Sequence, residues 1–261
     1  MFKTIDQLGR AINLLNPPKR IVSLVPSQTE LLHYLGLEDE VVGITKFCVH
    51  PNNWFRNKTR IGGTKNVNVE AIKILNPDLI IANKEENVKE QIEELAKYYP
   101  VWVSDVNNLN DALQMIEAVG LLTATTEKAN DLSLTIRNKF NQFKTQNSKL
   151  KTCYLIWRNP YMTIGGDTYI NNMLQYIGVK NVFENTTRYP EITLQQIAAT
   201  KCNFVLLSSE PYPFKQVHID EIKAIMPNVK VLLVDGEMFS WYGNRILQAA
   251  EYFKQLRDNI S

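Results

Sequence analysis

Aromatic and arginine side chains gather just after the short apolar runs of the C-terminal half. Tryptophan and tyrosine offer broad, flat faces and lose little entropy when they are ordered, and arginine pairs readily with anionic groups. These side chains therefore predict a binding surface for a large, flat ligand with anionic groups at its rim. The candidates in this half are Trp157, Arg158, Tyr161, Tyr212, Phe214, Phe239, Trp241 and Arg245.

The N-terminal half contributes a smaller set of candidates. His50 is a candidate ligand contact or axial metal ligand because it lies in a loop, whereas His33 falls within a helical pattern. His218 precedes a helical segment of the other half, and we expect its side chain to be solvated. The candidates in the N-terminal half are Ser27, Lys46, Phe47, His50 and Lys65.

Spacings typical of enzymes and of metal centres are missing from the sequence. It contains neither a G-x-S-x-G nor an H-E-x-x-H motif. Cys48, Cys153 and Cys202 show no C-x-x-C spacing, so they predict neither a zinc site nor a disulfide framework. We therefore assign no catalytic residue, no protein-held metal and no enzyme cofactor.

The elements that must position these residues are strands alternating with helices. Such alternation predicts an α/β protein whose parallel sheets are covered by helices on both faces. In sheets of this kind, ligands bind beyond the carboxyl ends of the strands. The strands that we predict lie at residues 21–25, 41–45, 79–82, 101–103, 152–157, 181–184, 204–208 and 231–235.

A long helix is predicted in the middle of the chain, from Ala124 to Asn147. It would span roughly 35 Å at about 1.5 Å per residue. Its apolar face consists of Ala129, Leu132, Ile136, Phe140 and Phe143, at spacings of three and four.

The two flanks of this helix resemble each other. Segments 69–82 and 194–207 both show a short helix, a turn and a buried strand, at a constant offset of 125 residues. We therefore expect an N-terminal lobe over residues 1–122, a linking helix over 123–148 and a C-terminal lobe over 149–261. A recurring helix-turn-strand pattern is also an ordinary property of α/β proteins, and that alternative stays open.

Composition restricts the remaining possibilities. The 261 residues are 44% hydrophobic and 21% charged, with a formal net charge of +2, and the charges are interleaved. This composition predicts a globular chain with no nucleic-acid surface, and no apolar run is long enough for a membrane span. Residues 1–20 contain no apolar core of a secretory signal, and Cys48 comes too late for a lipoprotein anchor. We therefore expect a cytoplasmic protein, or a periplasmic one if the sequence is a mature or trimmed form.

Several segments together resemble a known family. The opening R-I-V-S-L-V-P-S-Q-T-E-L-L at Arg20–Leu32 resembles that of the cobalamin- and iron-siderophore-binding proteins of ABC importers. The resemblance continues through V-G-I-T at Val42–Thr45, N-P-D-L-I at Asn76–Ile80 and the segment Trp241–Ala250, and it covers about Lys19 to Leu256. Within the family, the cobalamin binders are most similar.

The resemblance implies two Rossmann-like lobes joined by a rigid backbone helix, with a ligand cleft between them. It implies a metal chelate or tetrapyrrole as ligand, most of all a corrinoid such as cobalamin. It also implies an ABC permease as partner, contacted by one surface carboxylate of each lobe. The matching positions are Glu70 and Gln195, and Gln195 carries no charge.

The preferred interpretation is a monomeric substrate-binding protein of the ABC-importer type that is not an enzyme. One alternative is a cytosolic corrinoid or metal-chelate enzyme on the same scaffold, which would use His50, Glu210 or Asp235 as its titratable group. Another alternative is a sensor or carrier that delivers its ligand to a protein partner.

Overall fold

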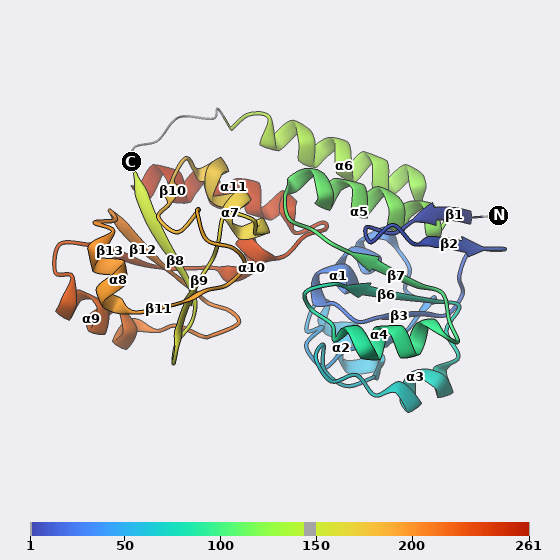
Figure 1. Ribbon diagram of the computed structural model, residues 1–261. Helices are drawn as coiled ribbons and strands as arrows, with labels where there is room; N and C mark the ends of the chain where they lie inside the picture. Colours follow the sequence, from blue (N-terminus) through green and yellow to red (C-terminus); the bar gives the residue numbers. More distant parts are fainter. Residues whose placement is uncertain (1, 144–149, 261) are drawn as a thin grey trace. The chain divides into compact units, whose positions relative to one another are not determined.

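The computed structural model describes residues 2–143 and 150–260, and the chain divides into two compact units. Unit 1 comprises Met1–Val106, Asn110–Arg137 and Trp241–Ile246. Unit 2 comprises Asn107–Leu109, Asn138–Ser240 and Leu247–Ser261. Strands and helices alternate along each of them (Figure 1).

Unit 1 is built on a five-stranded parallel sheet in the order β5-β4-β3-β6-β7, with a separate antiparallel hairpin of β1 and β2. Its strands are β1 (Phe2–Ile5), β2 (Ala11–Leu14), β3 (Ile21–Ser23), β4 (Val41–Ile44), β5 (Thr59–Arg60), β6 (Leu79–Asn83) and β7 (Val101–Ser104). The helices that begin in the N-terminal half are α1 (Pro26–Leu35), α2 (Asn52–Asn57), α3 (Val69–Leu75), α4 (Lys89–Ala96), α5 (Leu109–Leu122) and α6 (Thr126–Phe140).

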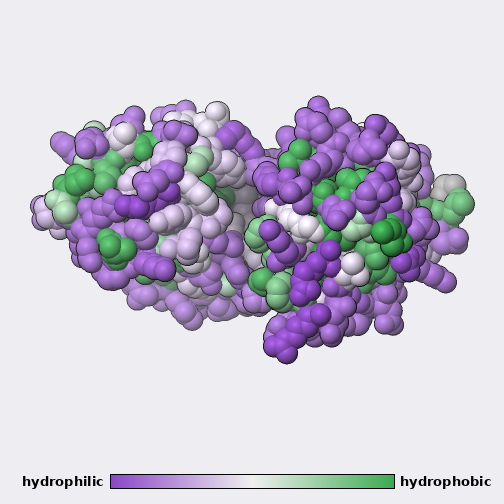
Figure 2. Space-filling view, turned by 90° about the horizontal axis from the view of Figure 1, so that it is seen from below, coloured by the Kyte–Doolittle hydropathy of each residue, from purple (hydrophilic) through white to green (hydrophobic). Residues whose placement is uncertain are grey.

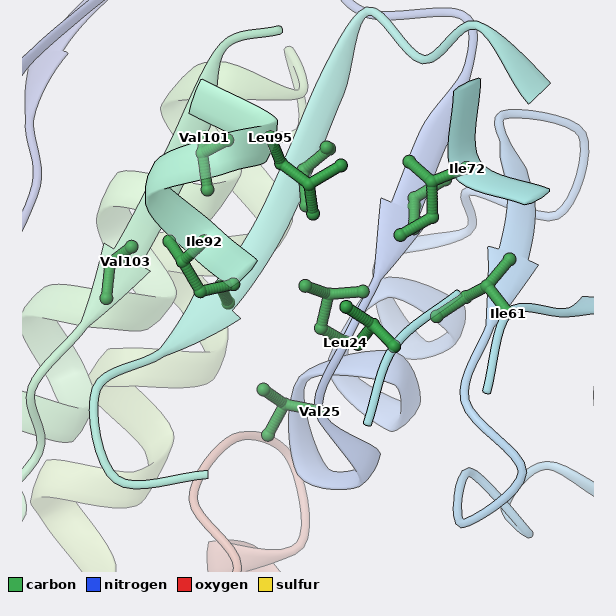
Figure 3. Close-up of a cluster of buried hydrophobic side chains, with 12 residues drawn as sticks. Leu24, Val25, Ile61, Ile72, Ile92, Leu95, Val101 and Val103 are labelled. Atoms are coloured by element: carbon green, nitrogen blue, oxygen red, sulfur yellow. The ribbon is translucent and has the colours of Figure 1, made fainter. Parts of the chain in front are cut away.

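Continuous apolar runs explain why this sheet is buried on both faces. Every residue of β3, β6 and β7 is buried, although β7 is at the edge of the sheet, as expected where helices cover both faces of a parallel sheet. Helices α4 and α5 lie on opposite sides of the sheet (Figure 1). On one face, Ile92 and Leu95 of α4 pack with Val101 and Val103 of β7 (Figure 3).

The predicted central helix is shorter in the structure. Ala124 adopts a left-handed conformation, with φ of 58°, and separates α5 from α6. The backbone amide of Phe143 donates to the carbonyl of Phe140, a tight final turn that closes the helix. Residues 144–147 of the predicted helix lie outside the described residues.

Unit 2 contains a six-stranded sheet in the order β11-β9-β8-β12-β13, with β10 beside β8. Strands β8, β12, β13 and β10 are parallel, whereas β9 and β11 are antiparallel to their neighbours. The strands are β8 (Lys151–Trp157), β9 (Tyr161–Thr163), β10 (Lys180–Asn181), β11 (Glu191–Ile192), β12 (Phe204–Ser208) and β13 (Lys230–Val234). The helices are α7 (Tyr169–Ile177), α8 (Leu194–Ala199), α9 (Gln216–Ile225), α10 (Gly236–Ser240) and α11 (Ile246–Ile260).

Two apolar layers hold unit 2 together. One layer packs Ile219 and Ile222 of α9 against Val205 and Leu207 of β12. The other is aromatic, with the Phe253 ring centroid 4.8 Å from that of Phe239 and 6.3 Å from that of Phe140.

The predicted α/β class with parallel sheets in two lobes is confirmed. The units differ from the predicted lobes in where two segments lie. Residues 107–109 group with unit 2, and Trp241–Ile246 groups with unit 1. The surface in Figure 2 is mostly hydrophilic, with separate apolar areas. Among the described residues, no helix is both long and apolar enough to span a membrane.

Candidate functional site

In unit 1, an ion pair fastens the segment Trp241–Ile246 to helix α1. Arg245 Nε and Nη2 each donate to a carboxylate oxygen of Glu30, both at 2.8 Å. The side chains of Arg245 and Glu30 are only 9% and 13% exposed. This packing places Trp241 and Arg245 in unit 1, although their position in the sequence had assigned them to the C-terminal lobe.

Gly243 explains how this segment comes so near to α1. Its φ is +123°, and a Cβ at this position would lie 3.3 Å from the Ser27 carbonyl oxygen and from Leu31 Cβ. Only glycine adopts such a backbone conformation easily.

The first candidate cluster therefore lies at the start of α1. The Arg245 guanidinium is 4.6 Å from the centroid of a Trp241 ring, and the His50 ring meets Trp241 edge-on at 5.8 Å. Ser27 is buried in the first turn of α1. The unit 1 cluster consists of Ser27, Glu30, His50, Trp241 and Arg245.

The other candidates of unit 1 are more exposed. Phe47 is 52% exposed in the loop after β4, and Lys46 Nζ lies 5.1 Å from its ring centroid. Lys65 is exposed, and its ammonium group donates to the Glu85 backbone carbonyl. These three residues supply cations and one aromatic face at the surface of unit 1.

In unit 2, the second candidate cluster is aromatic. Trp157, at the end of β8, is 38% exposed and meets the Tyr212 ring at 5.6 Å between centroids. Tyr212 is half-buried and lies 4.8 Å from the buried Phe214. The unit 2 cluster consists of Trp157, Arg158, Tyr161, Tyr212, Phe214 and His218.

Arg158 is already paired within unit 2. Its Nε and Nη2 donate to Glu221 at 3.0 and 3.1 Å. The hydrogen bond from Arg158 lowers the pKa of Glu221 and burial raises the pKa of Tyr161. Since Arg245 is paired with Glu30 in the same way, neither arginine is the uncompensated cation that the sequence suggested for an anionic rim.

Phe239 does not lie at the surface. It is fully buried, 5.1 Å from the Tyr154 ring and 4.8 Å from the Phe253 ring. Its side chain fills the core beneath the strand ends, so the structure separates it from the other candidates.

His218 was expected to be solvated, and that expectation is wrong. Only 7% of it is exposed, and both ring nitrogens have partners in unit 2. His218 lies three residues after Lys215, the N-cap residue of α9. From this position of a capping box, a side chain accepts a hydrogen bond from the backbone N–H of the N-cap residue.

Sequence reasoning did not predict two cavities of unit 2, although it had named Glu210 and Asp235, which line the first of them. One of about 550 Å³ lies at the ends of β12 and β13 and is lined by Ser209, Glu210, Leu233, Val234, Asp235 and Glu237. The other, of about 400 Å³, is lined by Gly166 and by polar side chains of loops and of α7: Asn107, Asn108, Asp167, Asn171, Asn172, Gln175 and Arg188. In the described part of the chain, no group of three or more histidine, cysteine or carboxylate side chains is arranged to hold a metal ion.

The two positions expected to contact a permease occupy equivalent places. Glu70 follows the N-cap Asn68 of α3 by two residues, and Gln195 follows the N-cap Thr193 of α8 by two residues. The Glu70 side chain is 78% exposed and pairs with Lys73 at 2.9 Å. A carboxylate is favoured at a helix N-terminus, and Gln195 lacks that charge.

Comparisons with known proteins extend over nearly the whole chain. A vitamin B12-binding protein of Photorhabdus laumondii subsp. laumondii is 26% identical over 250 residues, covering 94% of this chain and 90% of that protein. An uncharacterized ABC transporter substrate-binding lipoprotein of Bacillus subtilis is 27% identical over 262 residues, covering 94% and 82% of the two chains. The crystal structure of a periplasmic vitamin B12 binding protein, BtuF of Vibrio cholerae, matches with a TM-score of 0.79 at 21% identity, covering 94% and 98%.

These relatives overturn the prediction of a cytoplasmic location. One is named a lipoprotein and another a periplasmic protein, and both match along 94% of this chain. The prediction rested on the composition of residues 1–20 and on the position of Cys48 alone, whereas the relatives match nearly the whole chain.

The family itself is shown by a model of the periplasmic binding proteins, which matches residues 21–226. These residues include the five-stranded sheet of unit 1, all strands of the unit 2 sheet except β13, the helix α6 and most of the candidate site. The chain therefore belongs to the periplasmic binding protein family, whose members are binding proteins and not enzymes.

Proposed function

We propose that this chain is the substrate-binding protein of an ABC importer, and that its ligand is a metal chelate of the corrinoid class. The observation that carries the proposal is the exposed Trp157, which meets Tyr212 edge-on at the carboxyl end of β8. Such a pair offers a flat apolar face beside polar groups, which suits a planar macrocycle with amide side chains.

Relatives support the same ligand class. The Photorhabdus protein is named for vitamin B12, and its likeness covers 94% of this chain. In unit 1, Phe47 exposes a further ring surface after β4, and His50 meets the buried Trp241 ring edge-on. His50 is the residue that we propose as a direct contact to the ligand or its metal.

The proposed partner is a membrane permease, and the proposed place of action is outside the cytoplasm. Glu70 presents a carboxylate at the start of α3, where an arginine of a partner could reach it. Gln195 at the equivalent place offers only an amide, so we expect charge recognition to be stronger through unit 1. We expect the binding protein itself to act as a monomer.

The test is a titration of the purified chain with cyanocobalamin, haem and a ferric siderophore, followed by tryptophan fluorescence and calorimetry. We expect saturable one-to-one binding of cyanocobalamin, with a dissociation constant near or below about 1 μM, or −8 kcal/mol. If the chain bound only haem or only the siderophore tightly, that chelate, and not a corrinoid, would be its ligand. Binding of none of the three by the folded chain would refute the proposal.

A further inference from the structure

His218 holds the hydroxyl group of Tyr212 within the unit 2 cluster. Its Nδ1 atom accepts a hydrogen bond from the backbone N–H of Lys215 at 2.8 Å. Its Nε2 atom lies 3.3 Å from Tyr212 Oη. Both contacts come from a buried imidazole in the first turn of α9.

The backbone contact determines where the imidazole carries its hydrogen. A backbone amide can only donate, so Nδ1 must be the acceptor and carries no hydrogen. A neutral imidazole then carries its hydrogen on Nε2, and this N–H donates to Tyr212 Oη. Tyr212 thus serves as acceptor toward His218, and its own hydroxyl hydrogen is not used in that bond.

The Tyr212 ring is held in place on several sides. Trp157 and Phe214 meet it edge-on at 5.6 and 4.8 Å between centroids. In the described part of the chain, the bond to His218 is the one side-chain hydrogen bond that Tyr212 Oη makes. Because the ring is fixed and Tyr212 Oη already accepts a hydrogen bond from His218, the hydroxyl hydrogen is left to bond an acceptor outside the protein.

We propose that His218 is a positioning residue that makes Tyr212 Oη a hydrogen-bond donor to an acceptor oxygen of the ligand. This inference rests on the proposed function and names the ligand group beside the aromatic pair. Amide carbonyls at the rim of a corrin ring have the required chemistry. A hydrogen bond placed at the edge of the Trp157 face would fix the rotation of a stacked ring, which stacking alone leaves free.

The experiment compares four variants by calorimetric titration with cyanocobalamin. Tyr212→Phe removes the hydroxyl group. His218→Glu keeps an acceptor for the Lys215 amide, because glutamate is the usual residue of a capping box at this position, but it has no hydrogen for Tyr212. The double variant combines both changes. Val217→Ala alters a neighbouring, exposed residue of α9 and is the control.

We expect Tyr212→Phe and His218→Glu each to weaken binding by about two- to ten-fold, the range of one hydrogen bond. The double variant should bind no more weakly than the weaker single variant, and the control should bind like the wild type. The inference would be overturned if His218→Glu weakened binding as much in the Tyr212→Phe background as it does in the wild type. The added carboxylate would then weaken binding without any involvement of the Tyr212 hydroxyl group. Unchanged binding by Tyr212→Phe would overturn it as well.

A second measurement needs no ligand. Nitrogen-15 NMR of the imidazole in the free wild-type protein should show the hydrogen on Nε2, and a hydrogen on Nδ1 would overturn the inference even if the variants fail to fold. If the wild type binds cyanocobalamin and the variants bind it with the same affinity, this inference fails while the proposed function stands. Wild type that binds none of the three chelates would defeat the proposed function, and with it the donor role of Tyr212.

Discussion

Removal of one partner from the ion pair between Arg245 and Glu30 should strongly destabilise the protein. In the variant Glu30→Gln, the guanidinium keeps its position but faces a neutral amide in a site where both side chains are nearly buried. Breaking a fully buried pair by removing one partner costs about 3–5 kcal/mol. Some exposure remains and the stacking on Trp241 is kept, so we expect a loss of about 2–4 kcal/mol in the free energy of unfolding.

The assay is urea unfolding followed by circular dichroism, with thermal melting as a second measure. For a chain of this size the loss corresponds to a decrease in Tm of roughly 5–15 °C. Glu70→Gln is the matched control, because Glu70 also pairs with a cation but is exposed, and we expect a change below about 1 kcal/mol.

A double variant separates the charge from the packing. Glu30→Met together with Arg245→Met removes both charges and should be more stable than Glu30→Gln alone, because no buried cation is left without a partner. A loss below about 1 kcal/mol in Glu30→Gln, or a double variant that is less stable than it, would refute the reasoning.

Three further predictions follow from single contacts. Trp157→Ala should weaken cyanocobalamin binding by about 1–3 kcal/mol in a calorimetric titration, whereas the exposed Ile225→Ala should not; equal affinities would remove Trp157 from the site. Because Arg158 lowers the pKa of Glu221 in the folded state, this pair stabilises the protein above the unfolded pKa of a glutamate, and the stabilisation is lost as the pH falls through the lowered folded pKa. The difference in unfolding free energy between the wild type and Glu221→Gln should therefore shrink from pH 7 to about pH 3, and a constant difference would contradict this. Gly120→Ala should destabilise the chain by about 1–3 kcal/mol in urea unfolding, because a Cβ there would lie 2.2 Å from Ala129 Cβ, and adding Ala129→Gly should restore part of the loss.

The sequence predicted the fold well because the central strands of both sheets are almost wholly apolar. Segments such as Leu79–Asn83 and Phe204–Ser208 are buried along their whole length, so their apolar runs mark them directly. The hairpin of β1 and β2 was not predicted, since its residues are partly exposed and show no continuous run. The antiparallel strands β9 and β11 are three and two residues long, too short to give a pattern.

The site was predicted less completely, for a different reason. Residue type and position after a strand identified Trp157 and Tyr212, which the structure brings together. The same criteria selected Phe239, which is buried in the core, and they excluded His218 as a solvated side chain, although it is buried. They also gave no sign that Arg245 pairs with Glu30, a contact between residues 215 positions apart in the sequence. Such partners are set by tertiary packing and leave no local signal.

The placement of Trp241–Ile246 in unit 1 has a consequence for synthesis. Unit 1 lacks the arginine that neutralises Glu30 until residue 245 of the 261 has left the ribosome. The N-terminal half therefore cannot complete its native packing while the chain is growing, although domains commonly fold in order of their synthesis. A fragment ending at Arg137 should be less stable than unit 1 within the whole chain, because residue 245 must be synthesised before unit 1 can complete its folding.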